Sequence, residues 1–199
     1  MKKILVTGFG PFDRFFLNPS DEIARALSED NDNVVHRTLP VVFGEGRRSL
    51  LGALEVTRPE IVICFGLNGN IGHIALEEIA INITSSEIAD TSGNIPEDGI
   101  ISGEGPLAYR TRLPTREIME KLRKTGIPAR RSYSAGTYLC NEVFYTLMEW
   151  CNRNDSRGGF VHVPMATEMI ATDIRMYSTS HMSMDLLKKA GRIILSGSI

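Results

Sequence analysis

Short apolar runs alternate with stretches of helical periodicity along most of this chain, and this alternation constrains its fold most. Buried strands are expected for four apolar runs, at residues 4–9, 34–39, 61–65 and 160–163. Helices are expected at residues 45–56, 115–124, 140–152 and 182–195. A further helix begins near Ser20, which we expect to be its N-cap. Strands and helices in this order predict an α/β fold, with helices on both faces of a sheet.

The length and composition limit the class of protein. A chain of 199 residues is typical of one domain, which we expect to span residues 1–199. A net charge of −2 argues against a broad basic surface for nucleic acid. No apolar run approaches the roughly 20 residues of a membrane span, and no signal-peptide cleavage region is recognisable. Three cysteines without metal-ligand spacing fit a reducing compartment, so we expect a cytoplasmic protein.

Cys140 lies where a small-residue loop, residues 134–137, leads into a predicted helix. From Cys140 onward, Phe144, Leu147 and Cys151 recur at helical spacing and mark an apolar face. A thiol in the first turn of a helix is close to the positive end of the helix dipole and to unpaired N–H groups, which favour the nucleophilic thiolate. The same spacing also fits a second interpretation, in which Cys140 is a small core residue.

Glu77 is the second candidate for chemistry. If residues 74–83 form one strand, Glu77 lies on the apolar face with Ile79 and Ile81, and Glu78 lies on the other face. A carboxylate on an apolar face must find a partner or bind a proton, because burying a lone charge is costly. Alternatively, Glu77 lies at the end of the strand and reaches solvent.

His162 is the third candidate, because it closes a short apolar strand just before Pro164. Ligands of open α/β sheets gather outside the carboxyl ends of the strands, although a lone histidine there can also be structural. Cys140, His162 and Glu77 together supply the three roles of a cysteine hydrolase. The histidine would accept the thiol proton and later protonate the leaving amine, and the acid would orient the imidazole.

A glycine loop, residues 8–12, follows the first predicted strand. It lacks the third glycine of a dinucleotide-binding loop, and Pro11 removes a backbone donor that a phosphate would use. Phe9 and Phe12 beside two glycines suit a flat, uncharged ligand better, unless both rings only fill the core. The irregular stretch at residues 84–113 is long enough to suggest a functional loop or an oligomer contact.

These motifs resemble the pyroglutamyl peptidase type I (pyrrolidone carboxyl peptidase) family, which are cysteine peptidases that remove N-terminal pyroglutamate. The resemblance spans about residues 4–168. Its segments are residues 7–12 with Asn18-Pro19-Ser20, residues 76–82, residues 134–141 and residues 160–164. The fold we expect is a three-layer α/β/α sandwich with a mixed, mostly parallel central sheet. The resemblance implies Cys140 as nucleophile, His162 as base and Glu77 as orienting acid.

The resemblance also implies a binding site and an assembly. Phe9 and Phe12 would sandwich the lactam ring, and Asn18 would belong to the same substrate-binding segment. The backbone N–H of the nucleophile would form part of an oxyanion hole, together with the turn of Gly66 and Leu67. No metal or organic cofactor is implied. The expected partners are a peptide or small cyclic-amide substrate and other copies of the chain, as a tetramer or dimer.

The chain departs from the family pattern at two acidic residues. Glu78 follows Glu77 where the family usually has arginine, and Glu87 occupies the position of an arginine that many bacterial members carry near the active site. Loss of one oxyanion donor costs on the order of 3 kcal/mol. Two alternatives therefore stay open: a related thiol amidase whose substrate is shifted towards cationic groups, and a non-catalytic homologue that binds a cyclic amide or a peptide N-terminus.

Overall fold

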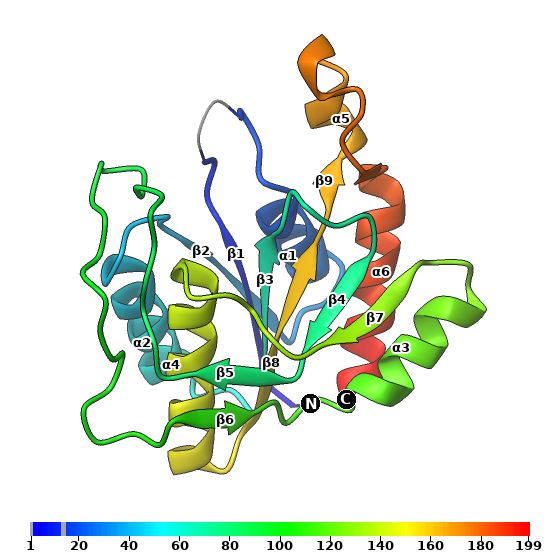
Figure 1. The fold of residues 1–199 in the computed structure, drawn as a ribbon. Coiled ribbons are helices and arrows are strands. Elements are labelled where there is room, and N and C mark those ends of the chain that lie inside the picture. The colour runs from blue at the N-terminus through cyan, green and yellow to red at the C-terminus, as the bar shows by residue number, and fades with distance from the viewer. Residues whose placement is uncertain (1, 13–14) are drawn as a thin grey trace.

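A six-stranded mixed sheet forms the middle of the molecule, as Figure 1 shows. The computed structural model describes residues 2–12 and 15–199, without the side chain of Ile174. The strand order is β2 (Val34–Leu39), β1 (Ile4–Phe9), β3 (Ile61–Leu67), β8 (Arg157–Val163), β4 (Ile74–Glu77) and β7 (Ala129–Ser132). The first four strands are parallel, whereas β4 is antiparallel to β8 and parallel to β7.

Helices cover both faces of this sheet, which confirms the predicted three-layer α/β/α sandwich. One face packs against α1 (Pro19–Glu29), α3 (Thr115–Lys124) and α6 (Met184–Ser198). The other face packs against α2 (Glu45–Thr57) and α4 (Leu139–Asn154). Alternate residues of the buried strands point into the two resulting cores, because successive side chains of a strand face opposite ways. No helix in the described residues is long and apolar enough to cross a membrane.

Short elements extend the edges of the sandwich. A two-stranded sheet of β5 (Ile79–Ile81) and β6 (Ala108–Arg110) lies beside α4. After β8 the chain forms β9 (Met165–Ala166), α5 (Thr167–Ile170), a 3-10 turn (Ile174–Met176) and β10 (His181–Met182). This segment projects from the top of the molecule in Figure 1, and β9 pairs with β10.

The start of α1 corrects the expected N-cap. Asn18, not Ser20, caps the helix, since its backbone is extended and its side chain accepts a hydrogen bond from the Ser20 amide at 3.1 Å. Pro19 occupies the first helical position, where a missing N–H costs nothing. The Ser20 hydroxyl lies inside the helix and accepts a hydrogen bond from the Phe9 amide at 3.0 Å, which ties α1 to the end of β1.

Two strand predictions were also incomplete. Residues 74–83 do not form one strand, because the backbone leaves β4 at Glu78: its N–H donates to Ser132 of β7 and its carbonyl accepts from Thr111. Glu77 therefore does not share a sheet face with Ile79. Strand β2 lies at the edge of the sheet and is buried only at its two ends, so the expectation of a fully buried strand was wrong there.

Candidate active site

The register of the sheet places a small residue on either side of His162. His162 pairs with Gly66 on β3 and with Ala75 on β4, and such cross-strand partners share one face. The space next to Gly66 is occupied by Cys140 Sγ and the Phe160 ring. Glu77 lies two residues beyond Ala75 and is therefore a diagonal neighbour of His162 on that face. Its Oε1 lies 2.8 Å from His162 Nδ1, and only 2% of Glu77 is exposed, so the alternative of a solvated carboxylate was wrong.

Cys140 reaches the same place from the helix layer. It is the second residue of α4, as the apolar spacing predicted, and no side chain caps this helix. The backbone N–H groups of Leu139 and Cys140 make no hydrogen bond to the described residues, so they are available to an oxyanion. A Cβ placed on Gly66 would lie 3.1 Å from Cys140 Sγ and 2.6 Å from the Phe160 ring. The thiol therefore occupies space that only glycine leaves free.

The ionisation of His162 follows from its two partners. Burial by itself lowers the pKa of His162, but the negative Cys140 side chain and the hydrogen bond and charge of Glu77 outweigh burial and raise the pKa to about 10. The hydrogen bond to Glu77 uses Nδ1, which leaves Nε2 for the hydrogen bond to Cys140. An imidazolium next to a thiol at neutral pH stabilises the thiolate, which is the nucleophilic form.

The other two thiols have no such partner. Cys64 and Cys151 are fully buried and free, and burial raises the pKa of each to about 12. Both therefore remain protonated at neutral pH and are poor nucleophiles. Among the three cysteines, only Cys140 is partly exposed and hydrogen-bonded to an imidazole.

Comparison with known proteins identifies the family. The family model described as pyroglutamyl peptidase matches residues 2–196. The chain belongs to the pyroglutamyl peptidase family. It is 39% identical to the pyrrolidone-carboxylate peptidase of Brachyspira hyodysenteriae, over 99% of this chain and 98% of that protein. It is also 39% identical to the pyrrolidone-carboxylate peptidase of Bacillus subtilis, over 96% of this chain and 90% of that protein.

Solved structures of the family have the same fold. Pyroglutamyl peptidase I of Bacillus amyloliquefaciens superposes with a TM-score of 0.92 at 37% identity, covering 100% of this chain and 97% of that one. Pyrrolidone carboxyl peptidase of Thermococcus litoralis also gives a TM-score of 0.92, at 36% identity, covering 100% of this chain and 93% of that one. The expected family and fold are thus confirmed.

The predicted substrate-binding residues differ in their exposure and in the side chains that they contact. Phe12 is half-buried, and its ring centroid lies 6.3 Å from that of Tyr138, two residues before Cys140. Phe9 is only 4% exposed and packs at 6.5 Å from Phe160, so it belongs mainly to the core beneath the site. Asn18 uses its side chain within the fold: besides capping α1, its Nδ2 donates to the Gly10 carbonyl at 2.9 Å. Their contact with substrate stays a prediction.

The residues of the expected oxyanion turn, Gly66 and Leu67, end β3 beside the thiol. Leu67 is half-buried, and the next amide, of Asn68, already donates to the Val163 carbonyl at 2.9 Å. This bond holds the turn against the end of β8, close to His162. The participation of the turn in an oxyanion hole also stays a prediction.

Sequence reasoning missed the attachment of residues 85–89 to the segment just before Cys140. Ser85 and Thr137 exchange two hydrogen bonds, of 3.1 and 2.7 Å, and the Tyr138 hydroxyl donates to the Ala89 carbonyl at 3.1 Å. Residues 85–89 are thereby fixed to the segment just before Cys140. The length of the irregular stretch was the only signal in the sequence, because backbone-directed bonds leave no periodic pattern.

Glu78 and Glu87, the two acidic residues that depart from the family pattern, lie in different surroundings. Glu78 is 1% exposed, and its carboxylate contacts Arg131 at 2.5 Å, Arg110 at 3.4 Å and the Thr115 hydroxyl. Burial raises its pKa, but these partners outweigh burial and lower it. Glu78 is therefore paired within the fold and offers no free charge to a ligand. Glu87, in contrast, is exposed on residues 85–89, and no described residue pairs with it.

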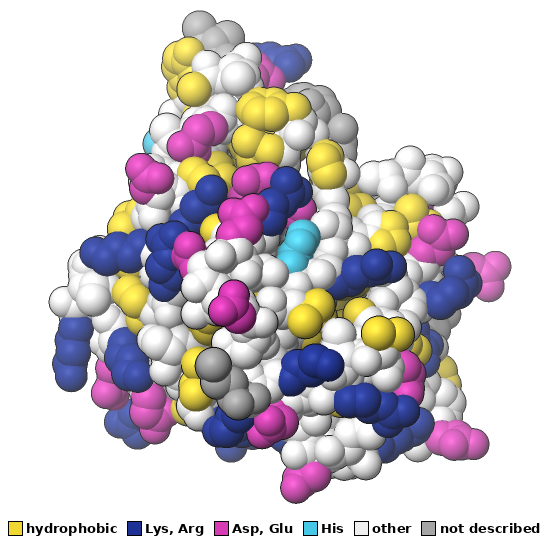
Figure 2. Space-filling view, turned by 180° about the vertical axis from the view of Figure 1, so that it is seen from behind, with side chains coloured by type: hydrophobic (Ala, Val, Ile, Leu, Met, Phe, Trp, Pro, Cys, Tyr) yellow, Lys and Arg dark blue, Asp and Glu magenta, His cyan; other side chains and the backbone are white. Residues whose placement is uncertain are grey.

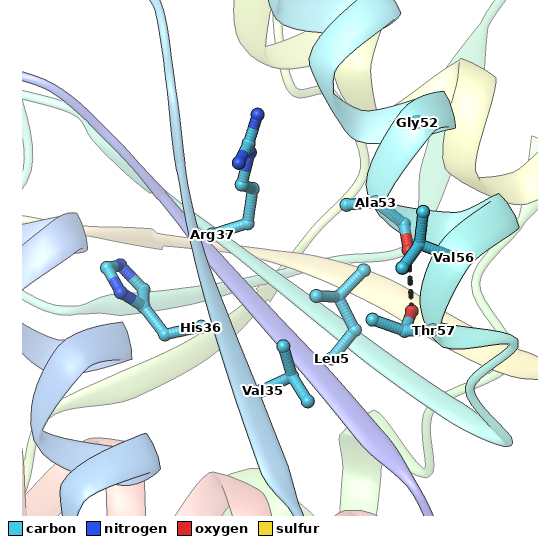
Figure 3. A pocket seen from close by; sticks show the side chains of 8 residues that line it. All are labelled: Leu5, Val35, His36, Arg37, Gly52, Ala53, Val56 and Thr57. Atoms are coloured by element: carbon cyan, nitrogen blue, oxygen red, sulfur yellow. Dashed lines mark hydrogen bonds between the residues drawn. The ribbon is translucent and has the colours of Figure 1, made fainter.

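A separate cavity of about 400 Å³ lies between β2 and α2 (Figure 3). It is lined largely by apolar groups, including Leu5 and Val56, and its only drawn hydrogen bond joins Thr57 to the Ala53 carbonyl within α2. Leu5 lies near the amino end of β1, whereas the thiol and imidazole lie near the carboxyl ends of β3 and β8. This cavity is therefore remote from the candidate active site.

The surface seen from behind carries both signs of charge. Figure 2 shows Lys and Arg side chains interspersed with Asp and Glu over the described part of this face. Charges of both signs are expected on the surface, because the chain has 22 Lys and Arg residues and 24 Asp and Glu residues.

Proposed function

We propose that this protein is a cysteine peptidase that removes N-terminal pyroglutamate (5-oxoproline) from peptides. One observation carries the proposal: the side chain of Cys140 at the start of α4 and the buried carboxylate of Glu77 act on the same buried imidazole, Glu77 through a hydrogen bond of 2.8 Å to Nδ1 and Cys140 by raising the pKa of His162. A nucleophile, a base and an orienting acid in this order are what acyl transfer from an amide requires. The relatives named pyrrolidone-carboxylate peptidase support the choice of substrate.

In the first step, the Cys140 thiolate attacks the carbonyl carbon of the pyroglutamyl peptide bond and forms a tetrahedral oxyanion. The unpaired N–H groups of Leu139 and Cys140, at the positive end of the α4 dipole, stabilise its charge. His162 then donates its Nε2 proton to the leaving amine, the C–N bond breaks, and a thioester with Cys140 remains.

In the second step, water replaces the amine. The acylated Cys140 carries no negative charge, so the pKa of His162 falls from about 10 and the imidazole becomes a base when one is needed. His162 takes a proton from water, the hydroxide attacks the thioester, and free pyroglutamate leaves as the thiol is restored. Through its hydrogen bond to Nδ1, Glu77 keeps the proton on that nitrogen of His162 during both steps.

The test is release of aminomethylcoumarin from pyroglutamyl-aminomethylcoumarin by the purified protein. Cys140→Ser should abolish turnover, because a hydroxyl next to His162 is not ionised as a thiol is. Cys64→Ala and Cys151→Ala are the controls, since both thiols are completely buried and burial raises the pKa of each to about 12. Turnover that survives in Cys140→Ser, or a folded wild type that releases nothing, would contradict the proposal.

A related thiol amidase with a shifted substrate is the second candidate, and the exposed carboxylate of Glu87 on residues 85–89 favours it. Prolyl-aminomethylcoumarin discriminates the two, because it has the same ring size but a cationic ring nitrogen in place of the neutral lactam. We expect the pyroglutamyl compound to be cleaved faster. The opposite preference would support the shifted amidase, and binding of either compound without cleavage would support a non-catalytic homologue.

We also place the protein in the cytoplasm as a homo-oligomer of one-domain subunits, residues 1–199. Three free thiols support a reducing compartment. Exposed apolar side chains on the long connection between β5 and β6 support self-association.

A further inference from the structure

Asn141 follows the nucleophile and is completely buried, yet the proposed reaction gives it no task. Its Oδ1 accepts a hydrogen bond from the Ile81 amide at 3.0 Å. Its Nδ2 donates to the carbonyl oxygens of Ile81 and Ile83, both at 2.9 Å. These partners also fix the orientation of the side-chain amide, because an N–H needs an acceptor and two carbonyls need donors. The hydrogen-bonding capacity of Asn141 is thus directed at one short segment, residues 81–83.

That segment is connected directly to the orienting acid. Residues 81–83 follow Glu77 by only a few positions, across the bend at Glu78, and Glu77 is hydrogen-bonded to His162. Asn141 therefore links Cys140, its neighbour in the chain, to residues 81–83 by hydrogen bonds. Residues 81–83 are joined along the chain to Glu77, which is hydrogen-bonded to His162. Cys140 comes from the helix layer and Glu77 from the sheet layer, and this amide is a directional link between the two.

Apolar packing alone would hold the thiol less precisely. Val143 and Phe144 of α4 face the core and are apolar, and apolar contacts do not fix direction. The buried Glu142 accepts a hydrogen bond from the Gly44 amide at 3.2 Å, but this bond ties α4 to the loop before α2 and not to the segment that follows Glu77. Cys140 Sγ has little freedom, since it lies 3.1 Å from where a Cβ on Gly66 would be. A small rotation of the first turn of α4 would break the hydrogen bond to His162. Three short, directional bonds prevent such a rotation.

We propose that Asn141 is a positioning residue that sets the approach of the Cys140 thiol to His162 by locking the first turn of α4 to residues 81–83. It acts through Cys140 and does not contact substrate. This inference rests on the proposed function, because it assumes that the contact between Cys140 and His162 is the catalytic one.

Ser156 provides a control outside the link between Cys140 and Glu77. It is also buried, 7% exposed, and its side chain also bonds to backbone: Oγ donates to the Pro59 carbonyl at 3.0 Å. Ser156 precedes the amino end of β8, whereas His162 lies near the carboxyl end of that strand. Ser156→Ala thus removes a buried hydrogen bond to the backbone without touching α4 or residues 81–83.

The experiment compares wild type, Asn141→Ala and Ser156→Ala at a temperature well below the Tm of each. We expect Asn141→Ala to lower kcat on pyroglutamyl-aminomethylcoumarin about 100-fold, with KM within about threefold, because misplacement by about 1 Å costs about that much in rate. Alkylation of Cys140 by iodoacetamide should require a higher pH in Asn141→Ala than in wild type. Ser156→Ala should lower the Tm but keep both kcat and the alkylation profile.

Two results would overturn the proposal: wild-type kcat and alkylation in Asn141→Ala, or equal losses in Asn141→Ala and Ser156→Ala, which would indicate stability alone. If Asn141→Ala does not fold, Asn141→Ser is measured in its place, with the same expectations. If wild type does not cleave the substrate, the proposed function fails, and the alkylation comparison alone decides the role of Asn141: a higher pH requirement supports it and an unchanged profile overturns it.

Discussion

At the scale of single residues, the raised pKa of His162 is the property on which the chemistry depends. With a pKa of about 10 against an ordinary 6.5, His162 is an imidazolium at neutral pH and places a positive charge next to the Cys140 side chain. We predict that iodoacetamide alkylates Cys140 about tenfold to hundredfold faster in wild type than in His162→Ala at pH 6, where an ordinary thiol is almost entirely protonated. The two rates should converge above pH 9. Equal rates at pH 6 would show that the imidazole does not activate the thiol.

Gly66 is a second single residue on which the site depends, because its missing side chain leaves space for Cys140 Sγ and the Phe160 ring. A methyl group there would meet the Phe160 ring at 2.6 Å and Cys140 Sγ at 3.1 Å. We predict that Gly66→Ala destabilises the protein by about 1–3 kcal/mol and lowers kcat, since overpacking moves the thiol or the ring. The control is Gly52→Ala in α2, where no atom lies within 4 Å of the new methyl group. Urea unfolding and turnover measure both effects, and a Gly66→Ala variant as stable and active as Gly52→Ala would refute the argument.

At the scale of elements, the break between β4 and β5 separates two neighbouring carboxylates with different tasks. Glu77 remains on β4 and faces His162, whereas Glu78 turns away and contacts Arg131 and Arg110. The pKa of Glu78 is lowered in the folded state, so its ion pairs stabilise the fold above about pH 4.5, the ordinary value, and this contribution is lost as pH falls through the lowered pKa.

We therefore predict a pH-dependent effect of Glu78→Gln. At pH 7 the variant should be less stable than wild type by about 1–3 kcal/mol, because the buried carboxylate loses its charge-assisted hydrogen bonds. The difference in the free energy of unfolding should shrink as pH falls below 4.5 and through the lowered pKa, as wild type loses the same charge. Urea unfolding at several pH values measures it. A difference that stays constant across this range would mean that the carboxylate charge contributes nothing.

The elements and the site residues differ in how well they could be predicted from the sequence. The buried strands and α4 were predictable because burial imposes periods of two and of about 3.6 residues on the apolar side chains. The three residues that we propose as a triad, Cys140, His162 and Glu77, were singled out by residue type and position, and by the family resemblance. The break at Glu78 and the cap at Asn18 were not predicted, because both depend on hydrogen bonds to the backbone of distant or neighbouring residues. The anchoring of residues 85–89 was missed for the same reason.

At the scale of the whole molecule, the site depends on connections outside the sandwich. The chain between β5 and β6 is attached through residues 85–89 to the segment just before Cys140 and otherwise lies over the α4 side of the fold. It also carries large apolar side chains that the isolated chain leaves exposed: Ile83, Ile88, Ile95, Ile100 and Leu107. Apolar side chains gathered on one segment are typical of surfaces that bind another protein, and a net charge of −2 opposes self-association only weakly.

We predict that this segment mediates contact with other copies of the chain. Wild type at tens of micromolar should have a mass above the 22.0 kDa of one chain by light scattering or sedimentation. Leu107→Asp together with Ile100→Asp should shift it to the monomer, because both residues are exposed and a buried unpaired carboxylate is costly at an interface. Val56→Asp, which alters an equally exposed apolar residue on α2, is the control and should leave the mass unchanged. A monomeric wild type would refute self-association, and a loss of mass in Val56→Asp alone would indicate that the interface lies on α2.

If the prediction holds, assembly also stabilises the connection that carries residues 85–89, so dilution to the monomer should raise KM more than it lowers kcat.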